Sequence, residues 1–293
     1  MKKAELVYDA KARLAEGPFW DKEQQQLIWV DIEGKTVNFL DPLGENEAHP
    51  VEQRVGVAVL SEKGYLYLGM DHGFYRYDRE SRKLTQISDP EEELPGNRFN
   101  DGKCDPLGNF WAGTMVLEGE EGNASLYKMD TQETVTTEIT DLTISNGLVW
   151  DEKKELMYFI DTPTHQIRAY PFDFNRGVIN GEAKIVFEVP DDFGHPDGMT
   201  MDREGMLWVA FFDGGCVRRI DPEEGKVLEK IDVPASNVTS CCFGGSEMDE
   251  LFITTAREGK SEEELAEEPH AGGIFRVKPG VKGVNSYRFQ DYT

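Results

Sequence analysis

LWVAFFDGGCVRRIDP, residues Leu207–Pro222, holds the pattern that decides the fold. An apolar run starts at Leu207 and leads into a turn of aspartate and two glycines, and a second strand-like run then ends at Asp221. Two such runs joined by aspartate and glycine are typical of a β-hairpin, because these residues readily adopt the backbone conformations of tight turns. The stretch therefore predicts one hairpin of a fold rich in β-strands.

The same hairpin unit recurs along the chain, and we identify six copies: Leu27–Pro42, Tyr65–Glu80, Asn109–Asp130, Leu156–Asp173, Leu207–Pro222 and Leu251–Val277. An aromatic residue or a leucine stands near the start of each copy, at successive spacings of 37, 45, 47, 50 and 44 residues: Trp29, Leu66, Trp111, Tyr158, Trp208 and Phe252. Repeats of about 40 to 50 residues with several strands each are typical of β-propellers. We therefore predict an all-β fold, a six-bladed β-propeller formed as a single domain by residues 1–293.

The ends of the chain are expected to close the ring. A strand near the N-terminus, Glu5–Tyr8, is predicted to pair with the strands of the C-terminal segment, because an unpaired sheet edge invites aggregation. Helical periodicity is rare in this sequence. Its best example, SEEELAEE at Ser261–Glu268, predicts either a short exposed helix or a solvated acidic loop.

The charge of the chain excludes two classes of partner. The formal net charge is −25, with 39% hydrophobic and 30% charged residues. Nucleic acids and anionic membranes bind proteins through lysine and arginine, so a chain this acidic is expected to bind neither. No apolar run has the length of a signal peptide or a membrane span, and we expect a soluble cytoplasmic protein.

The cysteines are expected to be reduced. Cys104, Cys216 and the adjacent pair Cys241 and Cys242 lack C-x-x-C spacing. Neighbours in one strand face opposite sides of a sheet, so a disulfide between Cys241 and Cys242 would be strained. Buried free thiols are the better interpretation for a cytoplasmic protein.

An oxygen-bearing side chain stands five residues ahead of an aspartate in four of the six units. The pairs are Glu16 and Asp21, Asn100 and Asp105, Asn146 and Asp151, and Asp197 and Asp202. Largely apolar residues separate the members of a pair, as expected for the short innermost strand of a blade. The second aspartates fall at turns, where we expect a structural role. The comparable stretches of the second and sixth units, 54–61 and 239–245, carry no carboxylate.

The shared register places the first members of these pairs at one level of a central channel. Two carboxylates and two amides that converge on one axis need a cation to neutralise and pair them. All the donors are oxygen atoms, which suit Ca²⁺, Mg²⁺ or Mn²⁺, with Zn²⁺ as a further candidate. The sequence therefore predicts a central metal-binding channel that holds one divalent metal ion, with Ca²⁺ as the first choice.

Several motifs resemble the SMP-30/gluconolactonase/regucalcin-like family over nearly the whole chain: EGPFWD, RFNDGKCDPLGNFWAGTM, SNGLVWD, DTPTHQI and PDGMTMD. The resemblance implies a six-bladed propeller that uses a divalent metal to hydrolyse sugar lactones. It implies that Glu16, Asn146 and Asp197 hold the metal and that Asp197 is also the general base. It further implies that three residues contact the substrate hydroxyls: Arg98, Asn100 and Glu118.

Some of these residues have simpler interpretations. Arg98 could pair with the acidic run Glu91–Glu93, which otherwise reads as a solvated surface stretch. Asp101 could serve only its turn or orient Asn100. His195 could line the mouth of the channel, although a lone loop histidine is weak grounds for a role. The strand position of Arg98, two residues from Asn100 on the same side, favours a place in the site.

Three functional hypotheses follow. Signatures of serine hydrolases, zinc proteases and P-loop enzymes are absent, which favours metal-assisted hydrolysis. The first hypothesis is a metal-dependent lactonase whose small-molecule substrate is a sugar lactone. The second keeps the metal but acts on phosphotriesters or aryl esters. The third is a binding propeller whose metal is structural. The sequence leaves monomer and dimer equally open.

Overall fold

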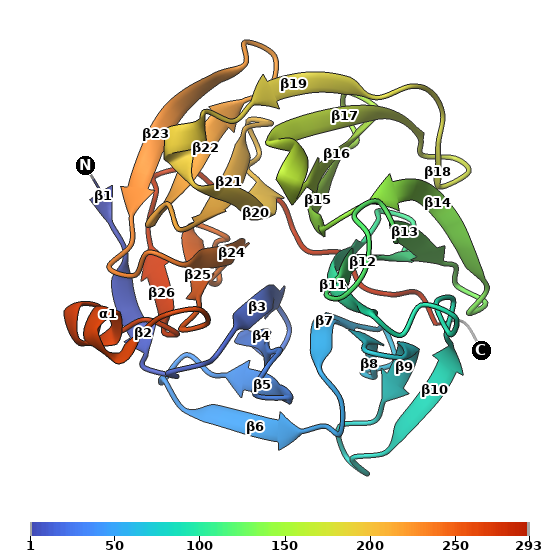
Figure 1. Ribbon diagram of the computed structural model, residues 1–293, viewed down its shortest axis with the longest axis horizontal. Coiled ribbons are helices and arrows are strands. Elements are labelled where there is room, and N and C mark those ends of the chain that lie inside the picture. Colours follow the sequence, from blue (N-terminus) through green and yellow to red (C-terminus); the bar gives the residue numbers. More distant parts are fainter. Residues whose placement is uncertain (1, 292–293) are drawn as a thin grey trace.

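The structure of the protein is a computed structural model, and it describes residues 2–291. Six β-sheets surround a common axis, as Figure 1 shows, and each consists mainly of four antiparallel strands. The predicted all-β, six-bladed propeller is therefore confirmed. The innermost strands of the six blades are β3 (Ala15–Asp21), β7 (Val55–Leu60), β11 (Asn97–Cys104), β15 (Ser145–Asp151), β20 (His195–Met201) and β24 (Val238–Gly244).

The hairpin units recognised in the sequence are the middle strands of the blades. The second strands are β4 (Gln26–Asp31), β8 (Leu66–Met70), β12 (Phe110–Val116), β16 (Leu156–Asp161), β21 (Leu207–Phe212) and β25 (Glu250–Thr255). The third strands are β5 (Thr36–Leu40), β9 (Gly73–Tyr77), β13 (Ala124–Met129), β17 (Gln166–Asp173), β22 (Cys216–Asp221) and β26 (Ile274–Val277). The outer edges are formed by β6 (Asn46–Pro50), β10 (Leu84–Ser88), β14 (Val135–Leu142), β18 (Val178–Ile179), β19 (Lys184–Glu188) and β23 (Lys226–Asp232).

The N-terminal segment closes the ring as predicted. Strand β2 (Glu5–Tyr8) pairs antiparallel with β26 and becomes the outer strand of the sixth blade. The short β1 (Lys2–Lys3) pairs in parallel with β23 of the fifth blade. The N-terminal segment thus bridges two neighbouring blades.

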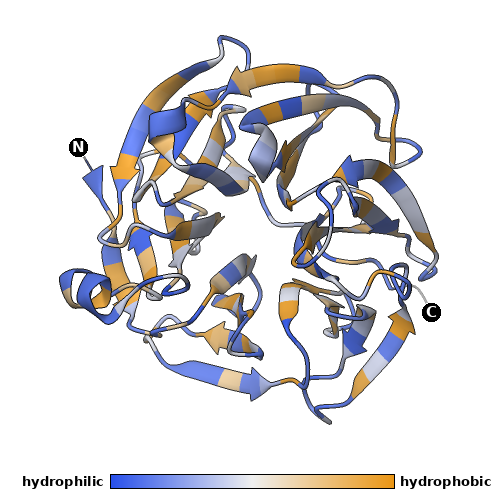
Figure 2. Cartoon of the chain, in the orientation of Figure 1, coloured by the Kyte–Doolittle hydropathy of each residue, from blue (hydrophilic) through white to orange (hydrophobic). Residues whose placement is uncertain are grey.

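The hydrophobic core lies between neighbouring blades. One cluster joins side chains of the first and second blades, and the next clusters repeat this arrangement around the ring. Trp111 and Trp208, which mark the hairpin repeat, are fully buried. Outer strands are more polar, and β6 is largely hydrophilic in Figure 2. Stacking of blades, rather than a single central core, therefore buries the apolar surface.

The aspartates that follow the inner strands are structural, as predicted. The Asp202 carboxylate accepts backbone N–H bonds from Glu204 and Met206 and the indole N–H of Trp208 at 2.9 Å. Asp105 makes the equivalent bond to the indole of Trp111. Each of these aspartates holds a turn, and two of them also fix the repeat tryptophan.

Each inner strand has an irregularity at the same place. The pairing between inner and second strand shifts register once in all six blades, for example between Glu16 and Phe19 in β3 and between Pro196 and Met199 in β20. A β-bulge of this kind redirects side chains locally. The oxygen-bearing residues of the sequence register lie at these bulges, near the start of their strands.

The C-terminal strap, defined here as residues 279–291, crosses the opposite end of the inner strands and is red in Figure 1. Its hydrogen bonds reach every blade: Arg288 to Asp21, Phe289 to Leu60, Gln290 to Gly108, Tyr287 to Glu152, Val284 to Met201 and Gly283 to Met248. Asn285 and Ser286 lie beneath the inner strands beside Lys103. The strap therefore covers the end of the channel that lies away from Glu16 and Asp197.

The structure also bears on the predictions made for the cysteines, for residues 261–268 and for membrane spans. All four cysteines are buried and free. Residues 261–268 contain a helix, α1 (Glu262–Glu267), which starts with a capping box between Ser261 and Glu264. Within residues 2–291, no helix has the length and apolar character needed to cross a membrane.

Candidate functional site

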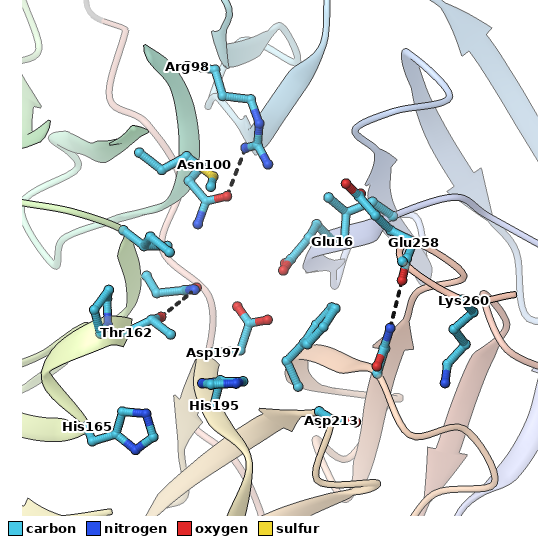
Figure 3. Close-up of a pocket in the computed structure, with 18 of the residues that line it drawn as sticks. Glu16, Arg98, Asn100, Thr162, His165, His195, Asp197, Asp213, Glu258 and Lys260 are labelled. Atoms are coloured by element: carbon cyan, nitrogen blue, oxygen red, sulfur yellow. Dashed lines mark hydrogen bonds between the residues drawn. The ribbon is translucent and has the colours of Figure 1, made fainter. Parts of the chain in front are cut away.

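One cavity of about 800 Å³ opens at the mouth of the channel. Its walls include side chains of β3, β11, β15 and β20, and Figure 3 shows Glu16, Asn100 and Asp197 directed into one space. Five of the residues predicted for the site line this cavity: Glu16, Arg98, Asn100, Asn146 and Asp197. The shared sequence register therefore corresponds to a shared position in space.

A glycine follows each predicted metal ligand, and two of these glycines, Gly147 and Gly198, let the inner strands come close together. A Cβ atom on Gly147 would lie 2.7 Å from the backbone oxygen of Asp197. A Cβ atom on Gly198 would lie 2.0 Å from the Ser240 hydroxyl oxygen. Any larger residue would push neighbouring blades apart, so the glycines keep the ligands within reach of one another.

Three carboxyl groups are buried together at the centre. Glu16, Asp101 and Asp197 are each less than 9% exposed. Burial, followed by the charges of Asp197 and Asp101, raises the pKa of Glu16 well above its ordinary value. Burial and then the charge of Asp101 raise the pKa of Asp197 well above its ordinary value, although hydrogen bonds with Asn146 and Glu16 oppose the shift. Such a group of acids attracts a cation, which would neutralise the mutual repulsion.

Asp101 is the member of this group that sequence reasoning did not place in the site. Burial raises its pKa, while the nearby Lys103 ammonium and the Gly102 backbone N–H oppose the shift. Its neighbour Asn100 also faces the channel, although successive residues of a regular strand face opposite sides. The bulge between Phe99 and Gly102 provides the reason, because it interrupts the alternation.

The two amides of the site differ in which atom is free. The Asn100 Nδ2 atom donates to the Ser145 backbone oxygen at 2.9 Å, and its Oδ1 atom accepts from Arg98 at 2.8 Å. The Asn146 Nδ2 atom donates to the Thr162 hydroxyl at 3.0 Å, whereas its Oδ1 atom is buried and has no hydrogen-bond partner. A buried acceptor without a donor is costly, so the Asn146 oxygen is available for a cation.

The residues present fit a hard divalent cation. Among residues 2–291, no group of three histidine, cysteine, aspartate or glutamate side chains could hold a metal ion. A site here therefore depends on the amide oxygen of Asn146 together with the carboxylates of Glu16 and Asp197. Carboxylate and amide oxygens are the donors that Ca²⁺ and related ions prefer.

Arg98 supplies positive charge on another wall of the cavity. Its side chain is buried and donates to the Phe99 backbone oxygen at 2.9 Å and to Asn100 Oδ1. Burial lowers the pKa of the Arg98 guanidinium, and nearby Arg54 adds to this effect, whereas Glu33, Glu258 and Glu16 oppose it. A buried cation with an unpartnered Nε–H can contact an oxygen of a bound molecule.

The interpretation of Glu91–Glu93 as a solvated run is wrong for its first member. Glu91 is buried, and its carboxylate accepts hydrogen bonds from Asn97, Thr114 and Tyr127 at 2.8 to 3.0 Å. Burial raises the pKa of Glu91, and these three donors oppose the shift. The carboxylate is therefore satisfied within the third blade rather than by Arg98.

Glu118 lies apart from the other predicted residues. It is exposed in the loop that follows β12, where its backbone N–H donates to the Gly96 oxygen at 3.1 Å. The cavity formed by the described residues is lined by Met115 of the same blade rather than by Glu118. Its role in substrate binding stays a prediction.

Sequence reasoning also missed much of the rim. Thr162, in the 3-10 helix η1 (Thr162–Thr164), lines the cavity, as does His165. The His165 ring meets the ring of His195 edge to face at 5.4 Å, and His195 lines the mouth, a place that the sequence analysis considered for it. Lys260 and Glu264 come from the loop and helix of the sixth blade. Thr162, His165, Lys260 and Glu264 lie outside the inner strands and share no register, so the repeat pattern could not reveal them.

The fold and this cavity define a class: six-bladed propellers with an acidic, oxygen-lined central site. The chain matches the family described as SMP-30/Gluconolactonase/LRE-like region over residues 14–257, and it belongs to that family.

Relatives match along nearly their whole length. YvrE of Bacillus subtilis (strain 168), provisionally named a sugar lactone lactonase, is 43% identical over 288 residues, which cover 98% of both chains. Regucalcin of Danio rerio is 37% identical over 291 residues, again with 98% of both chains covered. The crystal structure of a calcium-binding protein, regucalcin, from Agrobacterium tumefaciens superposes with a TM-score of 0.94 at 26% identity and covers 99% of this chain and 98% of its own.

Proposed function

We propose that this protein hydrolyses sugar lactones with the help of one divalent cation, with Ca²⁺ as the first choice. The observation that carries the proposal is the unpartnered Asn146 Oδ1 atom next to the buried carboxylates of Glu16 and Asp197. Similarity to the Bacillus subtilis protein named as a sugar lactone lactonase supports the substrate class. Similarity to the calcium-binding regucalcin of Agrobacterium tumefaciens supports calcium as the ion.

The proposed roles follow from the contacts of each side chain. Glu16, Asn146 and Asp197 would hold the cation, which when bound polarises the lactone carbonyl as a Lewis acid. Asp197 would accept a proton from the attacking water as general base; a carboxylate has two oxygens and can act in both roles. Arg98 and Asn100 would hold the hydroxyl groups of the sugar ring on the neighbouring wall.

Removal of metal tests the proposal directly. Protein treated with a chelator and then desalted is expected to lose hydrolysis of gluconolactone-type substrates, and added Ca²⁺ is expected to restore it. Acid release in weakly buffered solution measures the rate, with spontaneous lactone opening subtracted. A parallel series with Mg²⁺, Mn²⁺ and Zn²⁺ ranks the ions.

Two results would contradict the proposal. Full activity after complete chelation would exclude dependence on metal. Hydrolysis of phosphotriesters or aryl esters without hydrolysis of any lactone would favour the second enzymatic hypothesis, and inactivity on all three substrate classes would favour a binding propeller with a structural metal.

Arg98→Ala is expected to raise KM by about 10- to 100-fold and to leave kcat nearly unchanged, because the guanidinium would hold ground state and transition state alike. Steady-state kinetics with saturating Ca²⁺ measure both constants. Calcium affinity should persist, since Arg98 is not a proposed ligand. A fall in kcat with unchanged KM would show instead that Arg98 acts mainly in the transition state.

A further inference from the structure

A short chain of hydrogen bonds joins two strands of the site through Thr162. Asn146 of β15 donates from Nδ2 to the Thr162 hydroxyl oxygen at 3.0 Å, a bond drawn as a dashed line beside Thr162 in Figure 3. The Thr162 hydroxyl lies 2.8 Å from the backbone oxygen of Pro196 in β20. Pro196 directly precedes Asp197, and Thr162 is only 8% exposed.

In each of these two hydrogen bonds, the chemical groups determine which partner donates and which accepts. A backbone carbonyl can only accept, so the single hydroxyl proton of Thr162 points to Pro196. Towards Asn146 the hydroxyl therefore offers only a lone pair, and it must receive an N–H. Of the two ends of the Asn146 amide, only the NH₂ group can donate. The oxygen must then point away from Thr162.

We propose that Thr162 is a positioning residue that fixes the orientation of the Asn146 amide and so leaves its oxygen free to bind a cation. This inference rests on the proposed function, because it gives the amide oxygen a role as metal ligand. The same hydroxyl ties the strand of Asn146 to the strand of Asp197, so one side chain aligns two of the three proposed ligands. A reversed amide would place an N–H group, which cannot bind a cation, where the free oxygen now lies.

The amide oxygen of Asn100, unlike that of Asn146, already has a hydrogen-bond donor. Its NH₂ group donates to the Ser145 backbone oxygen, and its oxygen accepts from the Arg98 guanidinium. That oxygen is already satisfied by a cationic side chain, so it is a poor metal ligand. The two asparagines are alike in the sequence register, and their hydrogen-bond partners determine which one offers a free oxygen.

Thr162→Val tests the inference, because valine has nearly the same shape and lacks the hydroxyl. We expect its Ca²⁺ affinity, measured by isothermal titration calorimetry, to fall by about 10- to 100-fold, as is usual when a group that orients a metal ligand is lost. Thr162→Ser keeps the hydroxyl and is expected to stay within about threefold of the wild type. Thermal unfolding of the metal-free variants checks that both fold.

A double-mutant cycle with Asn146 separates the loss of amide orientation from general structural damage. In an Asn146→Asp background the two side-chain oxygens are equivalent, so no reversed amide exists. Thr162→Val is therefore expected to cost clearly less affinity in that background than in the wild type. An equal loss in both backgrounds, or unchanged affinity of Thr162→Val, would overturn the inference.

The orientation of Asn146 can also be observed without metal. Hydrogen exchange of the Asn146 side-chain NH₂ group, followed by NMR in the metal-free protein, is expected to be slow in the wild type and in Thr162→Ser, and fast in Thr162→Val. A wild type that binds no cation would refute the proposed function and with it the role of the oxygen. Fast exchange in a wild type that does bind calcium would refute the positioning role alone.

Discussion

Asp197→Asn is expected to lower kcat by about 10²- to 10⁴-fold even at saturating metal. An amide oxygen can still bind a hard cation, so the variant should load at higher metal concentration, because a neutral oxygen replaces a charged one. An amide nitrogen cannot accept the proton of the attacking water, so the base is lost. Steady-state kinetics over a range of Ca²⁺ concentrations separate the two effects.

Asp213→Asn is a matched control for this variant. Asp213 lines the same cavity but has no proposed role, and its positive φ of 61° is well tolerated by asparagine. We expect near-normal kinetics from it. If Asp197→Asn instead recovers the wild-type kcat once metal is saturating, Asp197 is only a ligand and another group must act as the base.

Phe289→Ala is expected to lower the free energy of unfolding by about 3–5 kcal/mol, the usual cost of removing a buried phenylalanine ring. Phe289, in the C-terminal strap, is fully buried, and its ring centroid lies 4.1 Å from that of Tyr67. Its backbone N–H also donates to the Leu60 oxygen at 2.9 Å. Urea unfolding of the metal-free protein measures the change.

Leu43→Ala provides the comparison for the strap variant. Leu43 is 88% exposed, so its truncation is expected to change stability by less than about 0.5 kcal/mol. A loss below about 1 kcal/mol for Phe289→Ala would mean that the strap contributes little to the stability of the ring.

Most of the fold could be predicted because it is encoded locally. Each hairpin has its own apolar runs and turn residues, and six similar units at nearly even spacing can bury their faces only by stacking around an axis. The pairing of β2 with β26 follows from the need to cover an edge. The strap has no such local signal, since residues 279–291 carry no copy of the repeat, and their backbone hydrogen bonds go to residues far away in the sequence.

The site was predictable only in part. The register identified Glu16, Asn100, Asn146 and Asp197 as neighbours, because equivalent positions of a repeat meet at the axis. It could not show which amide oxygen is free, since that depends on partners brought from other strands. It likewise could not show that Glu91 is buried, because the three donors that satisfy it are 6 to 36 residues away.

The strap also affects how small molecules can enter and leave the site. Residues 279–291 cross the far end of the channel, so the strap obstructs passage from the cavity to that side of the ring. On the proposed lactonase activity, the substrate and the open-chain acid formed from it would both pass the rim, where His165, His195 and Lys260 line the cavity. An acid that has not yet left would exclude the next lactone, so we expect accumulated product to compete with substrate and to slow the reaction.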